Sequence, residues 1–387
     1  MAIPLSYNIR NLIVRKTTTL MTAAGIAMTI AVLLAVFGLN AGLKRAFAAQ
    51  GDPLRLIVLR KGGTAELTSV VTPAQLQIVK TFPGVAMGKD EQPLISMEVV
   101  TIINLANKEN EKGINITVRG VPWRGVEMRN AKLAEGRWFK SGLRELVVGK
   151  SIAKRYPDAR VGKQLKFGRG YWTVVGIVDG GDSAINSEIW GDGNQVAMDF
   201  NRPTAYSSLL IQATDEVTAA ALAKELEADR RLNVTAMSEK DYYARQTQSG
   251  VPLSFLGGFV CIIMAVGSAF AAMNTMYAAV ARRSKEIGTL RVLGFTKGSI
   301  LLSFLFESMV LSVLGGLLAC IITIPLNGLT TGIGNFITFS ETSFNFHIGP
   351  QAMVLSVLFS AILGAIGGFL PARQAAKKEI LTALRQT

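Results

Sequence analysis

Four long uncharged stretches divide the chain, and a long polar segment separates the first from the other three. Each stretch exceeds the roughly 20 apolar residues with which a helix crosses a bilayer. This pattern predicts an α-helical membrane protein with four transmembrane helices and a large mixed α/β extracytoplasmic domain inserted between helices 1 and 2. The stretches are Thr17–Leu43, Gln246–Ala281, Gly298–Leu326 (with one Glu307) and Thr342–Ala372 (with one His347).

The same pattern sets the expected limits of each part. Within the extracytoplasmic domain we expect one lobe from residues 44–135 and 205–245, and a second lobe from 136–204. The full order is an N-terminal amphipathic segment and first helix (1–43), the domain (44–245), a stalk and second helix (246–281), a coupling helix (282–298), a third helix (299–326), a short extracytoplasmic loop (327–350), a fourth helix (351–371) and a cytoplasmic tail (372–387).

The inserted domain mixes strand and helix patterns. Alternating or continuous apolar runs predict strands, and a period near 3.6 predicts helices. Expected strands are Leu54–Leu59, Leu94–Leu105, Asn115–Val121, Tyr171–Val178 and Ser207–Gln212, and expected helices are Pro73–Phe82 and Glu216–Arg230.

The second stretch is uncharged for 36 residues. A helix of that length measures about 54 Å, well beyond the roughly 30 Å hydrocarbon core. We therefore expect Gln246–Leu256 to form a helical stalk outside the membrane.

Basic residues give the chain a net charge of +14 and lie mainly at one side of the predicted helices. Lysine and arginine precede the first helix, fill the connection between the second and third, and follow the fourth, while residues 327–351 contain neither. Because such residues favour the cytoplasmic side, we expect a multi-pass bacterial inner-membrane protein with both termini cytoplasmic. We expect these basic residues to contact the lipid bilayer, and we expect no nucleic-acid partner.

Small residues recur within the predicted helices, where they let helix backbones approach closely in lipid. The alanines are spaced four apart in the first helix, and the glycines form a GxxxG pair in the fourth. They serve either packing within one bundle or a subunit interface. Glu307 is an intramembrane charge that either pairs with a nearby basic group or holds the coupling segment to the bundle. The packing residues are Ala23, Ala27, Ala31, Ala35, Gly364 and Gly368.

Motifs for catalysis are missing from the sequence. It contains no G-x-x-x-x-G-K-[ST] run, so the chain has no P-loop. Its single histidine, His347, excludes paired-histidine zinc sites, and Cys261 and Cys320 fall inside predicted helices. We expect no catalytic, cofactor-binding or metal site in this chain.

Three stretches together resemble the MacB/LolC/FtsX-type permeases of ABC transporters, the type VII or mechanotransmission class. They are Asn8–Leu43, the run RRSKEIGTLRVLG at Arg282–Gly294 with a downstream Glu307, and PARQAAKKEILTALR at Pro371–Arg385. The GRWF, ELVVGKSIAKR, VGKQLKF and WTVVGIV runs resemble the second lobe of that family's extracytoplasmic domain.

The resemblance implies an ATPase that is a separate polypeptide, because no fused ATPase is present. It implies two copies of a LolD/MacB-like ATPase that bind ATP and Mg, and a second permease copy or a paralogue. A periplasmic adaptor and an outer-membrane protein are further candidate partners. The segment that would couple to the ATPase contains Arg282, Arg283, Lys285, Glu286, Ile287, Leu290, Arg291, Leu293 and Gly294.

These observations favour a permease subunit that transmits ATP-driven movement across the inner membrane to an extracytoplasmic domain. The family implies export or extraction of a lipid, lipoprotein, peptide or hydrophobic drug. One alternative is an FtsX-like regulator of cell-wall hydrolases, and another is an ATP-independent membrane-anchored scaffold or sensor.

Overall fold

The computed structural model describes Arg10, Val14 and residues 16–106, 112–247, 251–335 and 338–378, leaving aside the side chains of Thr18 and residues 251–253. The chain divides into two compact units. The helical unit comprises Met1–Ala41, Pro252–Leu329 and Phe346–Thr387. The sheet unit comprises Gly42–Val251 and Thr330–Asn345.

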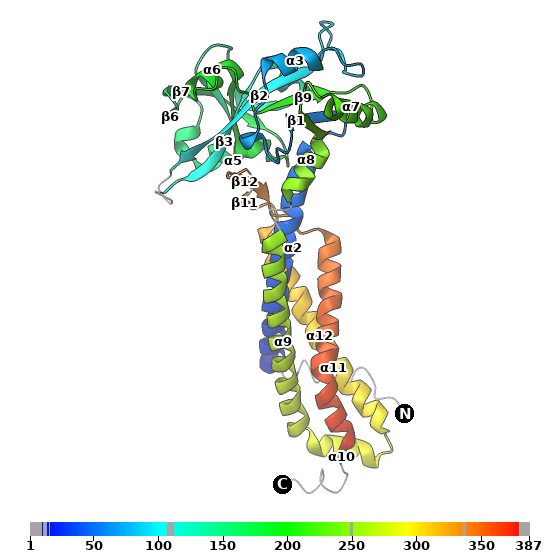
Figure 1. The fold of residues 1–387 in the computed structure, drawn as a ribbon. Helices are drawn as coiled ribbons and strands as arrows, with labels where there is room; N and C mark the ends of the chain where they lie inside the picture. Colours follow the sequence, from blue (N-terminus) through cyan, green and yellow to red (C-terminus); the bar gives the residue numbers. More distant parts are fainter. Residues whose placement is uncertain are drawn as a thin grey trace. The chain divides into compact units, whose positions relative to one another are not determined.

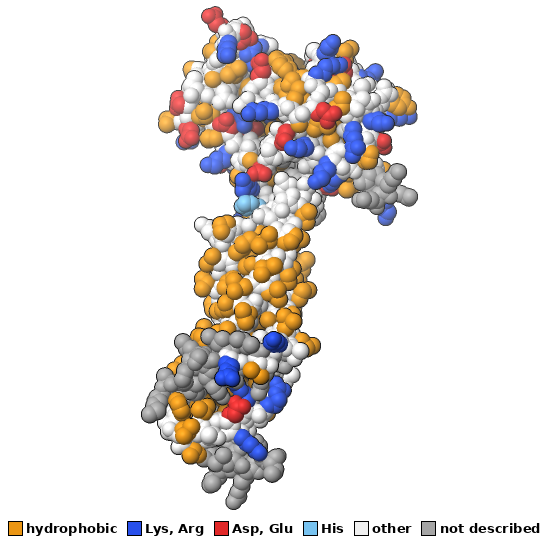
Figure 2. All heavy atoms as spheres, turned by 180° about the vertical axis from the view of Figure 1, so that it is seen from behind, with side chains coloured by type: hydrophobic (Ala, Val, Ile, Leu, Met, Phe, Trp, Pro, Cys, Tyr) orange, Lys and Arg blue, Asp and Glu red, His pale blue; other side chains and the backbone are white. Residues whose placement is uncertain are grey.

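Four of the described helices are long and apolar enough to cross a membrane, with mean hydropathies between 2.2 and 2.4. Hydrophobic side chains cover the middle of the helical unit in Figure 2, where they are coloured orange. Together with the α/β unit inserted after the first helix, this arrangement confirms the predicted fold class (Figure 1). The helices are α2 (Lys16–Gln50), α9 (Val251–Arg282), α10 (Ser284–Val292), α11 (Lys297–Thr323) and α12 (Pro350–Lys377), with a 3-10 turn η5 at Ile324–Leu326.

The sheet unit contains one ten-stranded sheet in the order β10-β1-β9-β2-β3-β8-β5-β7-β4, with β6 paired to β7. Strand β2 joins its two halves, because Ile95–Glu98 pair with β9 and Val99–Leu105 pair with β3. The strands are β1 (Arg55–Arg60), β2 (Ile95–Leu105), β3 (Ile114–Val121), β4 (Lys132–Gly136), β5 (Glu145–Gly149), β6 (Gln164–Phe167), β7 (Gly170–Asp179), β8 (Glu188–Asp192), β9 (Ser208–Gln212) and β10 (Val234–Ser238).

Short helices complete this unit, and its described residues form three hydrophobic cores. One core lies under α7 and includes Leu222 and Leu226, a second includes Trp172 and Ile152, and a third includes Trp190. The helices are α3 (Pro73–Val79), α4 (Trp123–Met128), α5 (Lys150–Arg155), α6 (Gly193–Asp199), α7 (Glu216–Ala228) and α8 (Glu239–Gln246), with 3-10 turns η1 (Glu66–Thr68), η2 (Pro157–Ala159) and η3 (Ala184–Ser187).

A second, two-stranded sheet belongs to the sheet unit although it lies between α11 and α12 in sequence. It is the hairpin of β11 (Thr330–Gly334) and β12 (Glu341–Asn345). Thr117 donates to the Ser340 hydroxyl at 2.8 Å, and Ser187 donates to the carbonyl of Ser343 at 3.2 Å. Arg155 pairs with Glu341 and also donates to Ser343 at 2.6 Å. The predicted extracytoplasmic loop therefore contains strands that dock onto the sheet.

The predicted boundary between the two lobes differs from the structure, and parts of three predicted segments lie outside the described residues. The predicted lobe limit at residue 135 separates strands that pair, because β3 pairs with β8 and β4 with β7. The change of partner falls inside β2 instead. Residues 248–250 of the predicted stalk, most of the opening segment before Lys16 and the end of the closing motif after Lys378 lie outside the described residues.

Candidate functional site: the connection between α9 and α11

The predicted coupling segment forms a short helix with defined ends. Helix α10 ends before Gly294, whose φ of +91° favours glycine. The Gly294 amide donates to the Arg291 carbonyl at 3.2 Å, and the Phe295 amide donates to the Leu290 carbonyl at 3.1 Å. Thr296 then caps α11, its hydroxyl accepting from the Ser299 amide at 3.2 Å. The connection is therefore a helix, a glycine turn and a new cap.

One face of α10 packs against the helical unit. Ile287 is 1% exposed and lies in a cluster with Ile300, Phe304 and Ala372. This cluster joins α10 to α11 and α12. Ile287 was expected to contact a soluble partner, but it faces the interior of the helical unit.

A buried ion pair fastens the start of α10 to α11. Arg283 Nη1 lies 2.7 Å from Glu307 Oε2, and both side chains are almost fully buried. The Arg283 guanidinium also lies 5.5 Å from the centre of the Phe304 ring. Removing one partner of such a pair leaves an unpaired buried charge, which typically costs about 3–5 kcal/mol. The contact thus fits both roles considered for Glu307, which are pairing with a basic group and holding the coupling segment to the bundle.

The opposite face of α10 and the turn after it are exposed. Val292 and Leu293 are 61% and 64% exposed. Lys285 and Glu286 are exposed too, whereas Leu290 and Arg291 are half-buried. Of the predicted coupling residues, Arg283 and Ile287 therefore bind inward and the others remain accessible to a partner to differing degrees. The helical period shows that two faces exist, but only the packing shows which one is covered.

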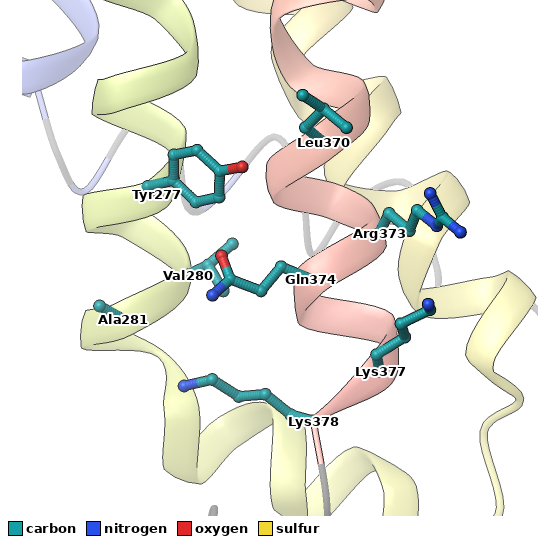
Figure 3. A pocket seen from close by; sticks show the side chains of 8 residues that line it. All are labelled: Tyr277, Val280, Ala281, Leu370, Arg373, Gln374, Lys377 and Lys378. Carbon is teal, nitrogen blue, oxygen red and sulfur yellow. The ribbon is translucent and has the colours of Figure 1, made fainter.

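A cleft with a volume of ≈ 730 Å³ lies between α9 and α12 at the same end of the helical unit. Gln374 and Lys378 extend from α12 toward α9, whereas the ends of Arg373 and Lys377 lie on the other side of α12 (Figure 3). Lys378 Nζ donates to the Ser284 hydroxyl at 2.8 Å, which links the end of α12 to the start of α10. None of the described residues lining the cleft is acidic. They are Tyr277, Val280, Ala281, Leu370, Arg373, Gln374, Lys377 and Lys378.

The predicted glycine pair brings α11 and α12 together within the chain. The Ser308 hydroxyl donates to the Gly364 carbonyl at 2.7 Å. A Cβ atom on Gly364 would lie 2.8 Å from the Ser308 carbonyl oxygen, and one on Gly368 would lie 2.5 Å from the Ser308 hydroxyl. Packing within one bundle, one of the two roles considered, accounts for both glycines.

The predicted alanine series on α2 is buried at its start. Ala23 and Ala27 are 5% and 1% exposed, and Ala31 and Ala35 are half-buried. A Cβ atom on Gly315 of α11 would lie 2.9 Å from the Ala23 carbonyl oxygen. Small residues therefore allow close contact between α2 and α11 as well.

A buried charge network in the sheet unit was not predicted. Arg119 lies 2.8 Å from Glu66, 2.9 Å from Glu98 and 2.9 Å from Glu188. Arg129 also pairs with Glu98. Burial alone would raise the pKa of Glu66, but Arg119 outweighs it and holds that pKa below its ordinary value. The sequence signs are charged residues within the apolar runs of two strands, Glu98 in β2 and Arg119 in β3.

Glu239, at the start of α8, extends this network. Its carboxylate lies 2.6 Å from Arg55 Nε, and burial raises its pKa although Arg129 and Arg55 oppose the shift. The adjoining Tyr242 and Tyr243 are 1% and 3% exposed, and Gln50 donates to the Tyr243 hydroxyl at 2.6 Å. These tyrosines are therefore core residues rather than exposed binding aromatics.

Two family models match the chain. Residues 19–229 match the MacB-like periplasmic core domain, and residues 258–380 match the FtsX-like permease C-terminal domain. The first match covers more than half of the chain.

Several curated proteins are similar along most of this chain. The uncharacterized ABC transporter permease YknZ of Bacillus subtilis is 25% identical over 97% of this chain and 96% of its own length. The macrolide export ATP-binding/permease protein MacB is 24% identical in Pasteurella multocida and 22% in Hahella chejuensis. These matches cover 96% and 85% of this chain but only 58% and 55% of those proteins. The chain thus spans little more than half the length of its MacB relatives.

Two solved extracytoplasmic domains resemble part of the chain. The extracellular domain of YknZ from Gram-positive bacteria is 17% identical, with a TM-score of 0.36, over 48% of this chain and 100% of that one. The periplasmic region of MacB from Actinobacillus actinomycetemcomitans is 12% identical, with a TM-score of 0.37, over 50% of this chain and 92% of that one.

Proposed function

Because this chain belongs to the family of ABC transporter permeases that combine a MacB-like periplasmic core domain with an FtsX-like permease domain, we propose that it transmits movement from a separate ATPase to its sheet unit. It is a membrane protein with four spans and a periplasmic or extracellular domain. The attachment of α10 carries the proposal. A helix fixed on one side and exposed on the other can receive force from a bound partner and pass it on.

One side of α10 is fixed to the helical unit, and the other side is exposed to a partner. Arg283 and Ile287 hold the helix to α11 and α12 through a buried ion pair and an apolar cluster. Val292 and Leu293 remain exposed at its end and offer apolar area that a soluble partner could bury. Interface energy usually concentrates in a few such well-packed residues. We place the ATPase contact at Leu293 and its neighbours.

The distribution of charge supports the orientation of the chain. Arg282, Lys285, Arg291 and Lys297 surround α10, and Arg373, Lys377 and Lys378 lie at the end of α12. Positive residues of this kind favour the cytoplasmic side. We therefore place α10 and both termini in the cytoplasm of a bacterial cell, with the spans in the inner membrane.

The remaining parts of the assembly follow from the family. Two ATPase copies would bind ATP and Mg, and a second permease copy or a paralogue would complete the transporter. MacB relatives are named for macrolide export. For this chain the proposed cargo is a lipid, lipoprotein, peptide or hydrophobic drug that is handled outside the membrane.

Leu293→Asp tests the proposed contact. The acid would place a charge where the ATPase is expected to bury an apolar side chain, and we expect binding to weaken by about thirtyfold, which corresponds to a hot-spot residue of about 2 kcal/mol. The measurement is co-purification and titration of a LolD/MacB-like ABC ATPase from the same organism with the full chain in detergent.

Val217→Asp is the matched control. Val217 is 81% exposed but lies on α7 in the sheet unit, so the same substitution should leave ATPase binding unchanged. Full ATPase binding by Leu293→Asp would remove the physical basis of the proposal.

A further inference from the structure

A second pocket lies in the sheet unit. Its volume is ≈ 360 Å³, within the range of small-molecule sites. It collects residues from the start of β2, the start of α4, the segment between β4 and β5, and the start of α6. The lining residues are Met97, Pro122, Trp123, Phe139, Ser141, Asp192, Gly193, Asn194 and Tyr206.

The apolar walls of this pocket belong to a packed aromatic group. Trp123 remains 51% exposed although its indole nitrogen donates to Glu127 at 2.8 Å. Its ring centre lies 6.0 Å from that of Trp138, in an edge-on arrangement, and Trp138 stacks on Trp190 at 6.3 Å. An indole held in this way can receive a ligand at little cost in side-chain entropy.

The pocket also contains a buried carboxylate, Asp192, which is 4% exposed. One oxygen accepts from the Ser141 hydroxyl at 2.7 Å, and the other caps α6 by accepting from the Gln195 amide at 3.0 Å. Both donors are neutral. No cationic side chain of the described structure lies within ion-pair distance of Asp192.

Asp192 differs in this respect from the other buried carboxylates. Of the seven buried Asp and Glu residues in the described part of the chain, the other six each pair with an arginine. Those six are Glu66, Glu98, Glu188, Asp199, Glu239 and Glu307. A buried charge without a counter-charge is costly. Asp192, the one described buried carboxylate without an arginine partner, borders the pocket.

We propose that this pocket binds an organic cation, an amphiphile with an amine or quaternary ammonium group on an apolar body. The cation would supply the charge that Asp192 lacks, and Trp123, Phe139 and Tyr206 would contact the apolar body. Aromatic rings also attract cations directly through their electron-rich faces. The inference names a substrate class for the proposed transporter and rests on that function for its biological meaning, although binding can be measured without transport.

The experiment compares two probe ions of the same shape and opposite charge, tetraphenylphosphonium and tetraphenylborate. Binding to the full chain in detergent is followed by tryptophan fluorescence and equilibrium dialysis. In Asp192→Asn, the asparagine oxygen can still cap α6 by accepting from the Gln195 amide, and its NH2 group can donate to the Ser141 hydroxyl, so that hydrogen bond reverses its direction. We expect this variant to lose about tenfold or more in affinity for the cation, because one partner of a buried charge pair is removed. Its affinity for the anion should stay equal or rise.

Two further variants keep the test decisive. Glu127→Gln removes a carboxylate charge beside Trp123 that does not line the pocket, and the glutamine oxygen can still accept from the indole nitrogen, so cation binding should change by less than twofold. If Asp192→Asn melts at a lower temperature, Trp123→Leu is measured in its place. It should weaken binding of the cation, because it removes the exposed aromatic side chain from the pocket wall.

Unchanged cation binding in a folded Asp192→Asn, or an equal loss in Glu127→Gln, would overturn the proposal. Neither result bears on ATPase capture at Leu293, so failure of this inference and failure of the proposed function can be told apart.

Discussion

At the scale of single residues, Arg119 connects parts of the sheet unit that are far apart in sequence. Its guanidinium contacts Glu66 in η1, Glu98 in β2 and Glu188 in β8. Only the planar, five-donor guanidinium can satisfy several carboxylates at once in this way. Arg119 thus links the two halves of the sheet at their junction.

Arg119→Met should lower the free energy of unfolding of the sheet unit by about 3–5 kcal/mol, because it leaves buried carboxylates unpaired. In the wild type, the lowered pKa of Glu66 contributes stability at neutral pH that is lost as the pH falls through that pKa. In the variant the unpaired acids favour protonation, so its deficit should be smaller at pH 5 than at pH 8. Thermal melts followed by tryptophan fluorescence at both pH values measure this.

Arg137→Met is the control, because it breaks an ion pair with Glu145 in which Arg137 is 49% exposed. Its effect should stay below about 1 kcal/mol at either pH. A deficit for Arg119→Met that does not change with pH would contradict the assignment of protonation to the freed carboxylates.

Sequence reasoning identified the residues of α10 but not their directions. The motif and the charges marked Arg282–Gly294, yet Arg283 and Ile287 face inward. The direction of a side chain depends on where α11 and α12 pack, and those contacts join residues that are distant in sequence. Asp192 was not found for the same reason, since its lack of a cationic partner is visible only in three dimensions.

At the scale of elements, α11 and α12 pack through small residues rather than through interlocking large ones. Ser308 and Ser312 of α11 face Gly364 and Gly368 of α12. In lipid, where apolar burial between helices supplies little free energy, such close backbone contact is a main source of stability. The GxxxG spacing indicated a close helix contact, because it depends only on residues four apart on one helix, but it left open whether the partner helix belongs to the same chain.

Gly364→Ala and Gly267→Ala should act in opposite directions. The new methyl group at Gly364 would lie 2.6 Å from Ser312 Cβ and 2.8 Å from the Ser308 carbonyl oxygen, so it should cost about 1–3 kcal/mol. Gly267 on α9 has no neighbouring atom within 4 Å, so alanine there should be neutral or stabilise by about 0.5–1 kcal/mol through helix propensity. Thermal unfolding in detergent compares the two, and equal losses would argue against the α11–α12 contact.

At the scale of the whole molecule, the sheet unit is built from two separated segments of the chain. The four long helices and the inserted α/β unit followed from the length and period of apolar runs, and β7 was predicted almost to the residue. The hairpin of β11 and β12 was not predicted. Its strands are short, and the residues that it contacts, such as Arg155 and Ser187, lie far away in sequence.

A disulfide tests the docking of the hairpin. Thr117→Cys and Ser340→Cys replace two hydroxyls that lie 2.8 Å apart, in a chain whose Cys261 and Cys320 have been changed to alanine. We expect mild oxidant to cross-link the double variant almost completely, since the side chains already meet. Mobility in a non-reducing gel after cleavage between the two positions measures the link. Either single variant should remain uncross-linked, and a double variant that also stays open would show that the hairpin lies elsewhere.

The two-segment construction of the sheet unit also sets an order of events during synthesis. Residues 42–251 emerge from the ribosome before α9 and α11, and residues 330–345 emerge after them. At about 5–20 residues per second, the interval is on the order of ten seconds. During that time Thr117, Arg155 and Ser187 have no hairpin to bind. A nascent chain therefore carries an incomplete sheet unit until two more membrane-spanning helices have been made, and a chain truncated after α11 exports a domain that can never be finished.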